Sequence, residues 1–368
     1  MAIIQNKTMK ETVSILMTVY NGMPYLIEAV ESTLSQTYKD YEFFIIDDAS
    51  TDDSFVYLSK LKDSRIRLIK NVENLGQVKS LNKGLQLCRG TFVARLDQDD
   101  VNLPKRLEEQ ISFLKDNPNI SLICSYEHTI NSRGRKILDW KKNIENYGVF
   151  IAEIILGQCP VWHPSVMYRK KVVEKLGYYN TEYGPSEDYD LWTKFALNRY
   201  EAAIVPEFHL LQREHDARQS IISSDKQKHA TFDVHKNIIY DLLGENSLNS
   251  CLSSFLLLKD DLCGKRLIGK HLKEIINYSL IFFKIIDKTK QLSDNERRLF
   301  KKTIIKRLGY GIYLSGKFNF LPNYLFTFIF YLLSPIYFLK LRKVLAFSYR
   351  KFREIKNLIY FHRLINSK

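Results

Sequence analysis

The sequence has 368 residues, of which 45% are hydrophobic and 26% are charged. This composition is typical of a folded protein and excludes a disordered tail protein, a collagen-like repeat and a small disulfide scaffold. Five cysteines occur without a C-x-x-C pair, which favours buried thiols in a reducing compartment. The first nine residues lack the pattern of a signal peptide, so we expect no export.

The formal net charge is +14, and nearly all of it lies at the end of the chain. From Lys301 onward there are 14 Lys or Arg residues and one acid, Glu354, which leaves 41 basic and 40 acidic residues before that point. An acidic partner surface is therefore expected for the tail alone.

Short apolar runs alternate with amphipathic stretches in the first half of the chain. The runs are continuous and rich in branched or aromatic residues, as in buried parallel strands. They are residues 13–19, 43–47, 66–70, 91–96 and 120–125. The stretches expected to be helical are 25–35, 54–61, 78–88 and 105–117. This alternation predicts an α/β fold with right-handed crossovers and a mainly parallel sheet.

Polar clusters follow three of the predicted strands, at 18–21, 47–52 and 97–100. One such cluster is explained by turn and N-cap chemistry, for which Asp and Ser are suited. Turn chemistry does not explain three clusters at the strand ends of one sheet. Neighbouring carboxylates repel one another unless a cation or hydrogen-bond donors compensate their charge. Ligands of parallel α/β sheets bind beyond these carboxyl ends.

At these positions the sequence resembles family 2 glycosyltransferases, which have the GT-A fold. The matching stretches are VSILMTVYNG, FFIIDDASTDDS, NLGQVKSLNKGL, GTFVARLDQDD, HPSVMYR and EDYDLW, followed by REH. They occur in the order and with the spacing of the family, from residue 13 to about 220. The resemblance implies a GT-A catalytic domain, which we place over 1–224. The motifs stop after about Gln219, and the apolar and lysine-rich pattern of the remaining residues predicts a helical, membrane-associating region over 225–368.

The resemblance implies that the D-x-D element, Asp97-Gln98-Asp99, holds Mn²⁺ or Mg²⁺ on the diphosphate of a nucleotide-sugar donor. Carboxylates are hard oxygen ligands that suit both ions. Asp99 is the expected metal ligand, and Asp97 is expected to contact the ribose or a metal-bound water. His215 lies where related enzymes place a further metal or phosphate contact, with a surface-loop histidine as the alternative.

The same resemblance places the nucleotide. Asp48 matches the position that accepts a hydrogen bond from the uracil N–H, and Thr18 and Tyr20 flank the base. Asp47 is expected to cap the turn or to bind backbone amides. Lys79 is a candidate phosphate contact, with an ordinary solvated lysine as the alternative.

Asp188, in the stretch EDYDLW, is the expected catalytic base. It would take the proton of the acceptor hydroxyl as that oxygen attacks the anomeric carbon, with inversion. Glu187 is expected to orient a loop or the acceptor. Trp192 and His163 are candidates for the acceptor side, with a core tryptophan and a satisfied buried histidine as the alternatives.

Two departures from relatives bear on function. Processive synthases of the family carry Gln-x-x-Arg-Trp, whereas here Asp190-Leu191 precede Trp192, so we expect one sugar per encounter. Many relatives have Arg where Leu81 stands, so the contact of that Arg with a phosphate or the acceptor is not assumed here.

The segment 318–339 has no charged residue and is long enough to span a bilayer core of about 30 Å. Pro322 and Pro335 interrupt it, which favours an interfacial or re-entrant segment, with a core helix as the alternative. The basic, aromatic-rich residues that follow suit an anionic membrane face. We therefore expect a cytoplasmic enzyme, peripheral or monotopic on the inner face of the plasma membrane.

The predicted function is transfer of a sugar, most simply from a UDP-sugar, to a glycan or lipid-linked glycan in surface polysaccharide biosynthesis. Transfer to a polyprenyl phosphate is the closest alternative. A nucleic-acid-binding protein is an alternative of another class, suggested by the basic tail. The near-neutral first 300 residues, with acids at three strand ends, disfavour a polyanion partner, so we expect no nucleic acid.

Overall fold

The computed structural model describes residues 13–216, 218, 224–243 and 292–315. The described residues up to Phe300 belong to one compact unit, and residues 301–315 belong to a second. Helix α9 (Ser224–Leu243), which follows the predicted boundary at residue 224, is part of the first unit. The uncharged segment 318–339 and the basic tail lie outside the described residues. None of the helices in the described part combines the length and the apolar character needed to cross a bilayer.

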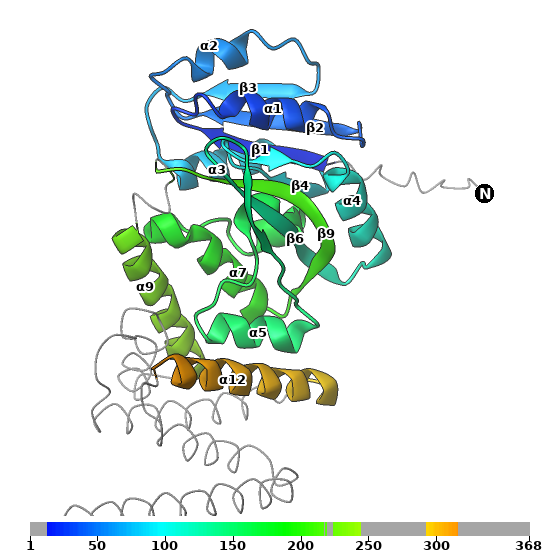
Figure 1. Cartoon of the computed structure of the whole chain (residues 1–368), viewed down its shortest axis with the longest axis vertical. Helices are drawn as coiled ribbons and strands as arrows, with labels where there is room; N and C mark the ends of the chain where they lie inside the picture. Colours follow the sequence, from blue (N-terminus) through cyan, green and yellow to red (C-terminus); the bar gives the residue numbers. More distant parts are fainter. Residues whose placement is uncertain (1–12, 217, 219–223, 244–291, 316–368) are drawn as a thin grey trace, which may run out of the picture. The chain divides into compact units, whose positions relative to one another are not determined.

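One nine-stranded sheet organises the described part of the first unit (Figure 1). Its strand order is β3-β2-β1-β4-β8-β6-β9-β5, and β7 pairs with β6. The strands are β1 (Val13–Val19), β2 (Tyr41–Asp47), β3 (Ile66–Lys70), β4 (Phe92–Arg95), β5 (Val101–Asn102), β6 (Ile120–Asn131), β7 (Lys136–Trp140), β8 (Met167–Arg169) and β9 (Glu201–Glu214).

The first half of the sheet forms as the sequence predicts. β1 lies between β2 and β4 and is parallel to both, and β3 continues the parallel set beyond β2. The crossovers are the four predicted helices, each within a few residues of its expected bounds. They are α1 (Leu26–Leu34), α2 (Ser54–Ser59), α3 (Gln77–Leu87) and α4 (Arg106–Asp116).

The second half confirms the mixed sheet that the GT-A resemblance implies, but corrects the expectation that it is mainly parallel. Four of the strand pairings in the described residues are parallel and four are antiparallel, so the sheet is mixed. The strand expected at 120–125 continues to Asn131, where it pairs with β7 and β9. The sequence did not indicate β9, because Pro206 interrupts its apolar pattern. The proline lies where the β6–β9 register shifts, a place at which a strand tolerates a missing N–H.

The core explains why these runs become strands. Nearly every side chain of β1 is buried, because the sheet is covered on both faces at this strand. Gly84 lets α3 approach β1 closely: a Cβ atom there would lie 2.3 Å from the Leu16 Cδ1 atom. A larger residue at this position would require the Leu16 side chain or the helix to shift.

A helical layer accompanies the antiparallel half. Helices α5 (Tyr147–Ile155), α7 (Glu187–Leu197) and α9 contact one another, and α9 also contacts the 3₁₀ segment Thr181–Ser186 (Figure 1). The Ser186 hydroxyl donates to the Gln227 carbonyl at 3.1 Å and meets the Thr231 hydroxyl at 2.7 Å. These contacts fix the N-terminal end of α7. The remaining described helices are α6 (Lys170–Lys175) and α12 (Asp294–Ser315).

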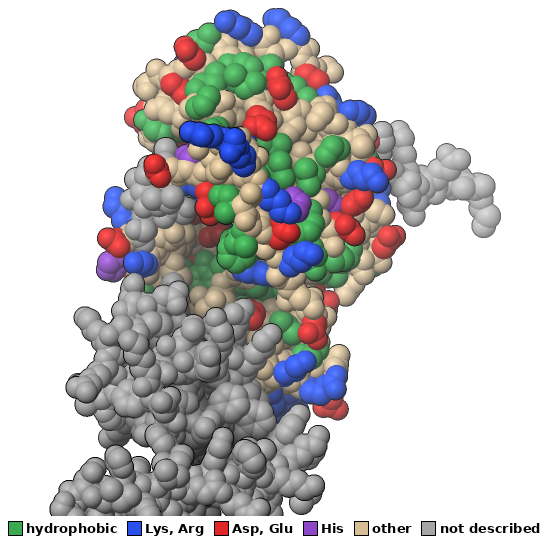
Figure 2. Space-filling model, viewed as in Figure 1, with side chains coloured by type: hydrophobic (Ala, Val, Ile, Leu, Met, Phe, Trp, Pro, Cys, Tyr) green, Lys and Arg blue, Asp and Glu red, His purple; other side chains and the backbone are tan. Residues whose placement is uncertain are grey.

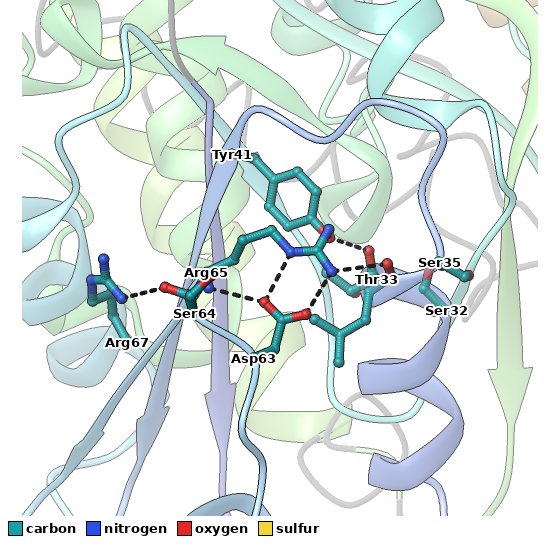
Figure 3. Close-up of polar contacts among 9 residues, drawn as sticks. Ser32, Thr33, Ser35, Tyr41, Asp63, Ser64, Arg65 and Arg67 are labelled. Atoms are coloured by element: carbon teal, nitrogen blue, oxygen red, sulfur yellow. Dashed lines mark hydrogen bonds and ion pairs between the residues drawn. The ribbon is translucent and has the colours of Figure 1, made fainter.

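Arg65 ties the start of β3 to the end of α1 (Figure 3). Its guanidinium donates to both oxygens of Asp63, at 2.9 and 2.7 Å, and to the Tyr41 hydroxyl at 2.6 Å. Tyr41 in turn donates to the Thr33 carbonyl at 2.7 Å. Burial raises the pKa of Tyr41 to about 12, and the hydrogen bonds from Arg65 lower the pKa of Asp63 to about 2.

We predict that Asp63→Asn lowers the free energy of unfolding by about 1 kcal/mol at pH 7, a value discounted because the pair is partly exposed. The pKa of Asp63 is lower in the folded state. Its contribution is therefore present above the ordinary aspartate pKa and is lost as the pH falls toward 2. Urea unfolding from pH 7 to pH 3 measures this difference. Asp53→Asn is the control, since Asp53 is exposed and makes no capping hydrogen bond. Equal losses in both variants would contradict the prediction.

Candidate active site

The site lies where β1, β2 and β4 end. Because these strands are parallel neighbours, their carboxyl ends meet at one edge of the sheet, as the sequence predicts. Two hydrogen bonds join the loop after β1 to the loop after β4. The Tyr20 amide donates to the Gln98 side chain at 2.8 Å, and that side chain donates back to the Tyr20 carbonyl at 3.1 Å. Asn21 joins the loop after β1 to the loop after β2, because its side chain accepts a hydrogen bond from the Thr51 amide at 2.8 Å.

Gln98, the middle residue of the D-x-D element, depends on a glycine. A Cβ atom at Gly22 would lie 2.9 Å from the Gln98 side-chain oxygen. A larger residue at position 22 would require the end of the Gln98 side chain to move away from the β1 loop.

Asp48 is buried and organises the loop that precedes α3. Its Oδ1 atom accepts hydrogen bonds from the Asn71 side chain at 2.6 Å, the Ser80 hydroxyl at 2.8 Å and the Leu75 amide at 2.9 Å. Its Oδ2 atom accepts the Gly76 amide at 2.8 Å, and Gly76 adopts a positive φ of 83° that favours glycine. The carboxylate thus holds the loop in place, and its predicted contact with uracil stays a prediction.

The other residues predicted to bind the nucleotide surround this edge. Thr18 is half-buried near the end of β1, the Tyr20 side chain just beyond is 46% exposed, and Lys79 is exposed on α3. The fully buried Asp47 accepts the Ser50 amide at 3.3 Å, which confirms the predicted turn cap. An exposed aromatic ring beside the edge leaves a π-face available to a flat ligand.

Asp97 is paired with a buried arginine. The Arg95 side chain, which has no exposed surface on β4, donates to the Asp97 Oδ1 atom at 2.5 Å. Burial acts to raise the pKa of Asp97, but the positive charge of Arg95, its hydrogen bond and the other basic side chains nearby together outweigh burial, and the pKa is lowered. Asp97 is therefore ionised over the whole neutral range.

Asp99 contacts His215, so the structure brings the two predicted metal ligands together. The His215 Nε2 atom lies 2.8 Å from the Asp99 Oδ2 atom. Burial and the charge of Asp97 raise the pKa of Asp99, and the contact with His215 opposes this. The His215 ring also lies 4.8 Å from the ring of Tyr25, just before α1. These contacts give His215 a defined place at the end of β9.

Arg213 holds the acidic loop, a role that the sequence did not indicate. Its amide donates to Asp100 Oδ1 at 2.9 Å, and its Nε atom donates to the Asp99 carbonyl at 3.1 Å. Its guanidinium also pairs with Glu28 on α1. Burial and the charge of Asp99 raise the pKa of Asp100 well above its ordinary value. The only sequence signal was the position of Arg213, two residues before the predicted ligand His215.

The stretch EDYDLW forms the first turns of α7, where backbone amides favour a carboxylate. The Asp188 Oδ1 atom accepts the Tyr189 amide at 2.7 Å, and the Cys159 thiol lies 3.9 Å from its Oδ2 atom. Burial raises the pKa of Asp188 to about 6. Burial and the charge of Asp188 raise the pKa of Glu187 to about 8, so Glu187 is protonated at neutral pH. Asp190 pairs with Lys194 at 2.8 Å, a structural role as predicted.

The end of β4 and the start of α7 lie within electrostatic reach of each other. The charges of Asp97 and Arg95 act on both Glu187 and Asp188. The structure therefore groups the D-x-D carboxylates with the predicted base, although about 90 residues separate them in the chain. A carboxyl with a pKa near 6 beside this group can accept a proton at neutral pH.

His163 and Trp192 lie behind the site. His163 is buried, its Nε2 atom lies 2.8 Å from the Tyr179 hydroxyl, and burial lowers its pKa to about 3. Trp192 has no exposed surface and packs edge-on against His163, with ring centroids 6.0 Å apart. The structure thus places both residues in the core, the alternative that the sequence left open for each.

Asp99 and His215 are the side chains at this edge that could hold a metal ion. No group of three or more His, Cys, Asp or Glu side chains in the described part of the chain is arranged around one point as metal ligands. Asp99 and His215 nevertheless offer a carboxylate oxygen and an imidazole nitrogen 2.8 Å apart. Such a pair fits Mn²⁺, and also Mg²⁺, where phosphate oxygens and waters complete the coordination.

Comparison with known proteins agrees with this geometry. Residues 14–177 match the family model described as "Glycosyl transferase family 2". An uncharacterized glycosyltransferase of Methanocaldococcus jannaschii, MJ1057, is 35% identical over 60% of this chain and 76% of its own length. The chain belongs to glycosyltransferase family 2. The putative glycosyltransferase EpsE of Bacillus subtilis is 33% identical over 50% of this glycosyltransferase and 66% of its own length.

Solved structures show the same fold. TarS 1–349 of S. aureus in complex with UDP has a TM-score of 0.52 at 16% identity, over 83% of this glycosyltransferase and 88% of that chain. The complex of TarS 1–349 with UDP-GlcNAc has a TM-score of 0.50 over 83% of this chain and 82% of that chain. At this identity the likeness concerns the fold alone, a mixed α/β sheet with flanking helices.

Proposed function

We propose that this glycosyltransferase moves a sugar from a UDP-sugar to a hydroxyl of a glycan or lipid-linked glycan, with inversion and one sugar per encounter. The observation that carries the proposal is the grouping of Asp188 with the D-x-D carboxylates. A base with a pKa near 6 thereby lies beside acids suited to hold a diphosphate through a cation.

The nucleotide would bind at the ends of β1 and β2. Thr18 and Tyr20 would flank the base, Asp48 would face its N–H, and Lys79 would reach a phosphate. The choice of uridine is supported by the TarS structures, which contain UDP and UDP-GlcNAc and share the fold. Asp97, ionised beside Arg95, is available to accept a hydrogen bond from a ribose hydroxyl.

Asp99 and His215 are the residues that would hold a divalent cation. When bound, the ion would offset negative charge on the diphosphate leaving group. The residues of the chain perform the remaining steps. Asp188 accepts the proton of the acceptor hydroxyl while the acceptor oxygen forms its bond to the anomeric carbon and the bond to the diphosphate breaks. Glu187, protonated at neutral pH, is able to donate a hydrogen bond to the acceptor and orient it.

We predict that Asp188→Asn lowers the rate of UDP release from a UDP-sugar by about 10²–10⁴, because the amide cannot accept the proton. UDP binding, measured by thermal shift, stays unchanged. The wild-type rate should fall as the pH is lowered through about 6, since protonation removes the base. Asp190→Asn is the matched control: it lies on the same helix and pairs with Lys194. A rate near wild type in Asp188→Asn would remove Asp188 from the mechanism.

We predict that Asp99→Ala abolishes the part of UDP binding that depends on metal. In the wild-type protein, UDP with Mn²⁺ should raise the melting temperature more than UDP with a chelator does, because tighter binding of the folded state stabilises it. The variant should show the same small shift in both conditions. Asp188→Asn serves as the comparison and should retain the full Mn²⁺ effect. An Asp99→Ala variant that kept this effect would exclude Asp99 as a ligand.

We also propose that the basic tail docks the enzyme on the inner leaflet of the plasma membrane, beside a lipid-linked acceptor of surface polysaccharide synthesis. The support is the charge asymmetry, since each Lys or Arg near an anionic surface contributes about 1 kcal/mol. A chain ending at residue 315 should bind phosphatidylglycerol vesicles much more weakly than the full chain in a sedimentation assay. Equal sedimentation of the two chains would contradict the proposal.

A further inference from the structure

The hairpin of β6 and β7 carries an exposed tryptophan next to the site. All five residues of β7 are exposed, and Trp140, at its end, is 37% exposed. Trp140 pairs in register with Glu127 on β6. Residues directly opposite each other in an antiparallel pair place their side chains on the same face of the sheet. Trp140 therefore shares a face with the buried carboxyl of Glu127. On the face of Figure 2, hydrophobic side chains lie next to Lys and Arg in the region of β6 and β9.

A second tryptophan joins Trp140 to the catalytic end of the site. The ring of Trp162 lies 5.3 Å from the ring of Trp140, and the two form a tryptophan pair. The Lys142 ammonium lies 4.3 Å from the centre of the Trp162 ring and donates to the Cys159 carbonyl at 2.6 Å. The Cys159 thiol lies 3.9 Å from the Asp188 carboxylate. A continuous chain of contacts thus links the pair to the proposed base.

Polar atoms with no partner lie beside the tryptophan pair. Neither carboxyl oxygen of Glu127 has a partner at full hydrogen-bond geometry among the described residues, although the Ser165 hydroxyl, Arg106 and Lys142 lie near enough to act on its pKa. Trp162 Nε1 and Thr129 Oγ1 also lack a partner among the described residues. The nearby Ser165 hydroxyl donates to the Trp162 carbonyl at 3.3 Å. Glu127 has no exposed surface, and burial raises its pKa to about 7. Buried polar groups without partners are unfavourable, so a ligand that pairs with them would be stabilising.

This combination matches the chemistry of a sugar ring. A pyranose has an apolar C–H face, which packs on indole rings, and hydroxyls, which donate to carboxyl oxygens and accept from an indole N–H. The mixture of aromatic surface with a few convergent polar groups is typical of small-ligand sites. The proposed nucleotide contacts lie at the ends of β1 and β2, whereas the tryptophan pair is linked to Asp188 through Lys142 and Cys159. The pair is therefore placed for the sugar that presents a hydroxyl to the base.

We propose that Trp140, Trp162 and Glu127 form a subsite for a pyranose ring of the acceptor. The ring lies on the tryptophan pair, and Glu127 accepts a hydrogen bond from one of its hydroxyls. Lys142 is a positioning residue, because it holds Trp162 against the Cys159 segment that contacts Asp188. This inference rests on the proposed glycosyl transfer, since it assigns the acceptor side of that same site.

The test uses the full chain with saturating UDP and Mn²⁺ and three probes: methyl β-glucopyranoside, methyl β-galactopyranoside and methyl N-acetyl-β-glucosaminide. Two of the three tryptophans are in the subsite and Trp192 is buried, so intrinsic fluorescence reports on binding. At least one probe should give a saturable change in the wild-type protein. Trp140→Ala, Trp162→Ala and Glu127→Gln should each weaken this binding by about tenfold, while UDP affinity stays unchanged.

Tyr126→Ala is the matched control, because Tyr126 is an aromatic residue of the same strand that faces the other way, against Phe208 at 5.6 Å. It should bind the probe as the wild-type protein does. No probe binding in a wild-type protein that binds UDP, or unchanged binding in all three subsite variants, would overturn the subsite. Weaker binding of UDP-GlcNAc but not of UDP in the tryptophan variants would assign the pair to the donor and overturn the acceptor assignment. A wild-type protein that fails to bind UDP would instead refute the proposed function itself.

Discussion

The structure of the site depends on how a set of acids is kept at one edge of a sheet. Asp97, Asp99 and Asp100 follow a single strand, and their mutual repulsion has to be offset within the fold. Arg95 pairs with the first, His215 contacts the second, and the backbone amide of Arg213 donates to the third. The three acids therefore differ in how readily they ionise. Asp97 is held ionised, whereas the pKa of Asp99 and of Asp100 is raised.

This partial compensation suits an edge that binds a charged ligand. If every acid of the loop were paired with a basic group, little negative charge would remain to attract a cation. If none were paired, the repulsion between the carboxylates would destabilise the loop. The same logic applies across the site, where Glu187 and Asp188 share the first turn of α7 and cannot both ionise easily. Glu187 has the higher pKa and Asp188 the lower one, so near neutral pH one carboxyl can donate a hydrogen bond and the other can accept a proton. Under the proposed function, this group would bind a diphosphate through a cation and accept a proton beside it.

The antiparallel half of the sheet gives the site its second side. β9 brings Arg213 and His215 back to the acidic loop, and the β6–β7 hairpin brings Trp140 to the face of Glu127. Under the proposals above, the parallel half holds the residues for the nucleotide, whereas the antiparallel half contributes both His215, for the cation on the diphosphate, and the residues for the acceptor. The two halves meet at β4 and β8.

The sequence by itself determined the parallel half, because its strands are continuous apolar runs and its helices are local amphipathic repeats. It also placed Asp48, Asp97 and Asp99 at strand ends, since parallel topology brings carboxyl ends together. It did not determine β7, whose exposed residues have no core-facing pattern, or β9, where Pro206 disguises a long strand. The roles of Arg95 and Arg213 and the burial of Glu127 were decided only by the tertiary structure. Arg213 has its partners far away in the chain, and Arg95 pairs with the nearby Asp97 inside the core. A buried charge is recognisable only when its surroundings are known.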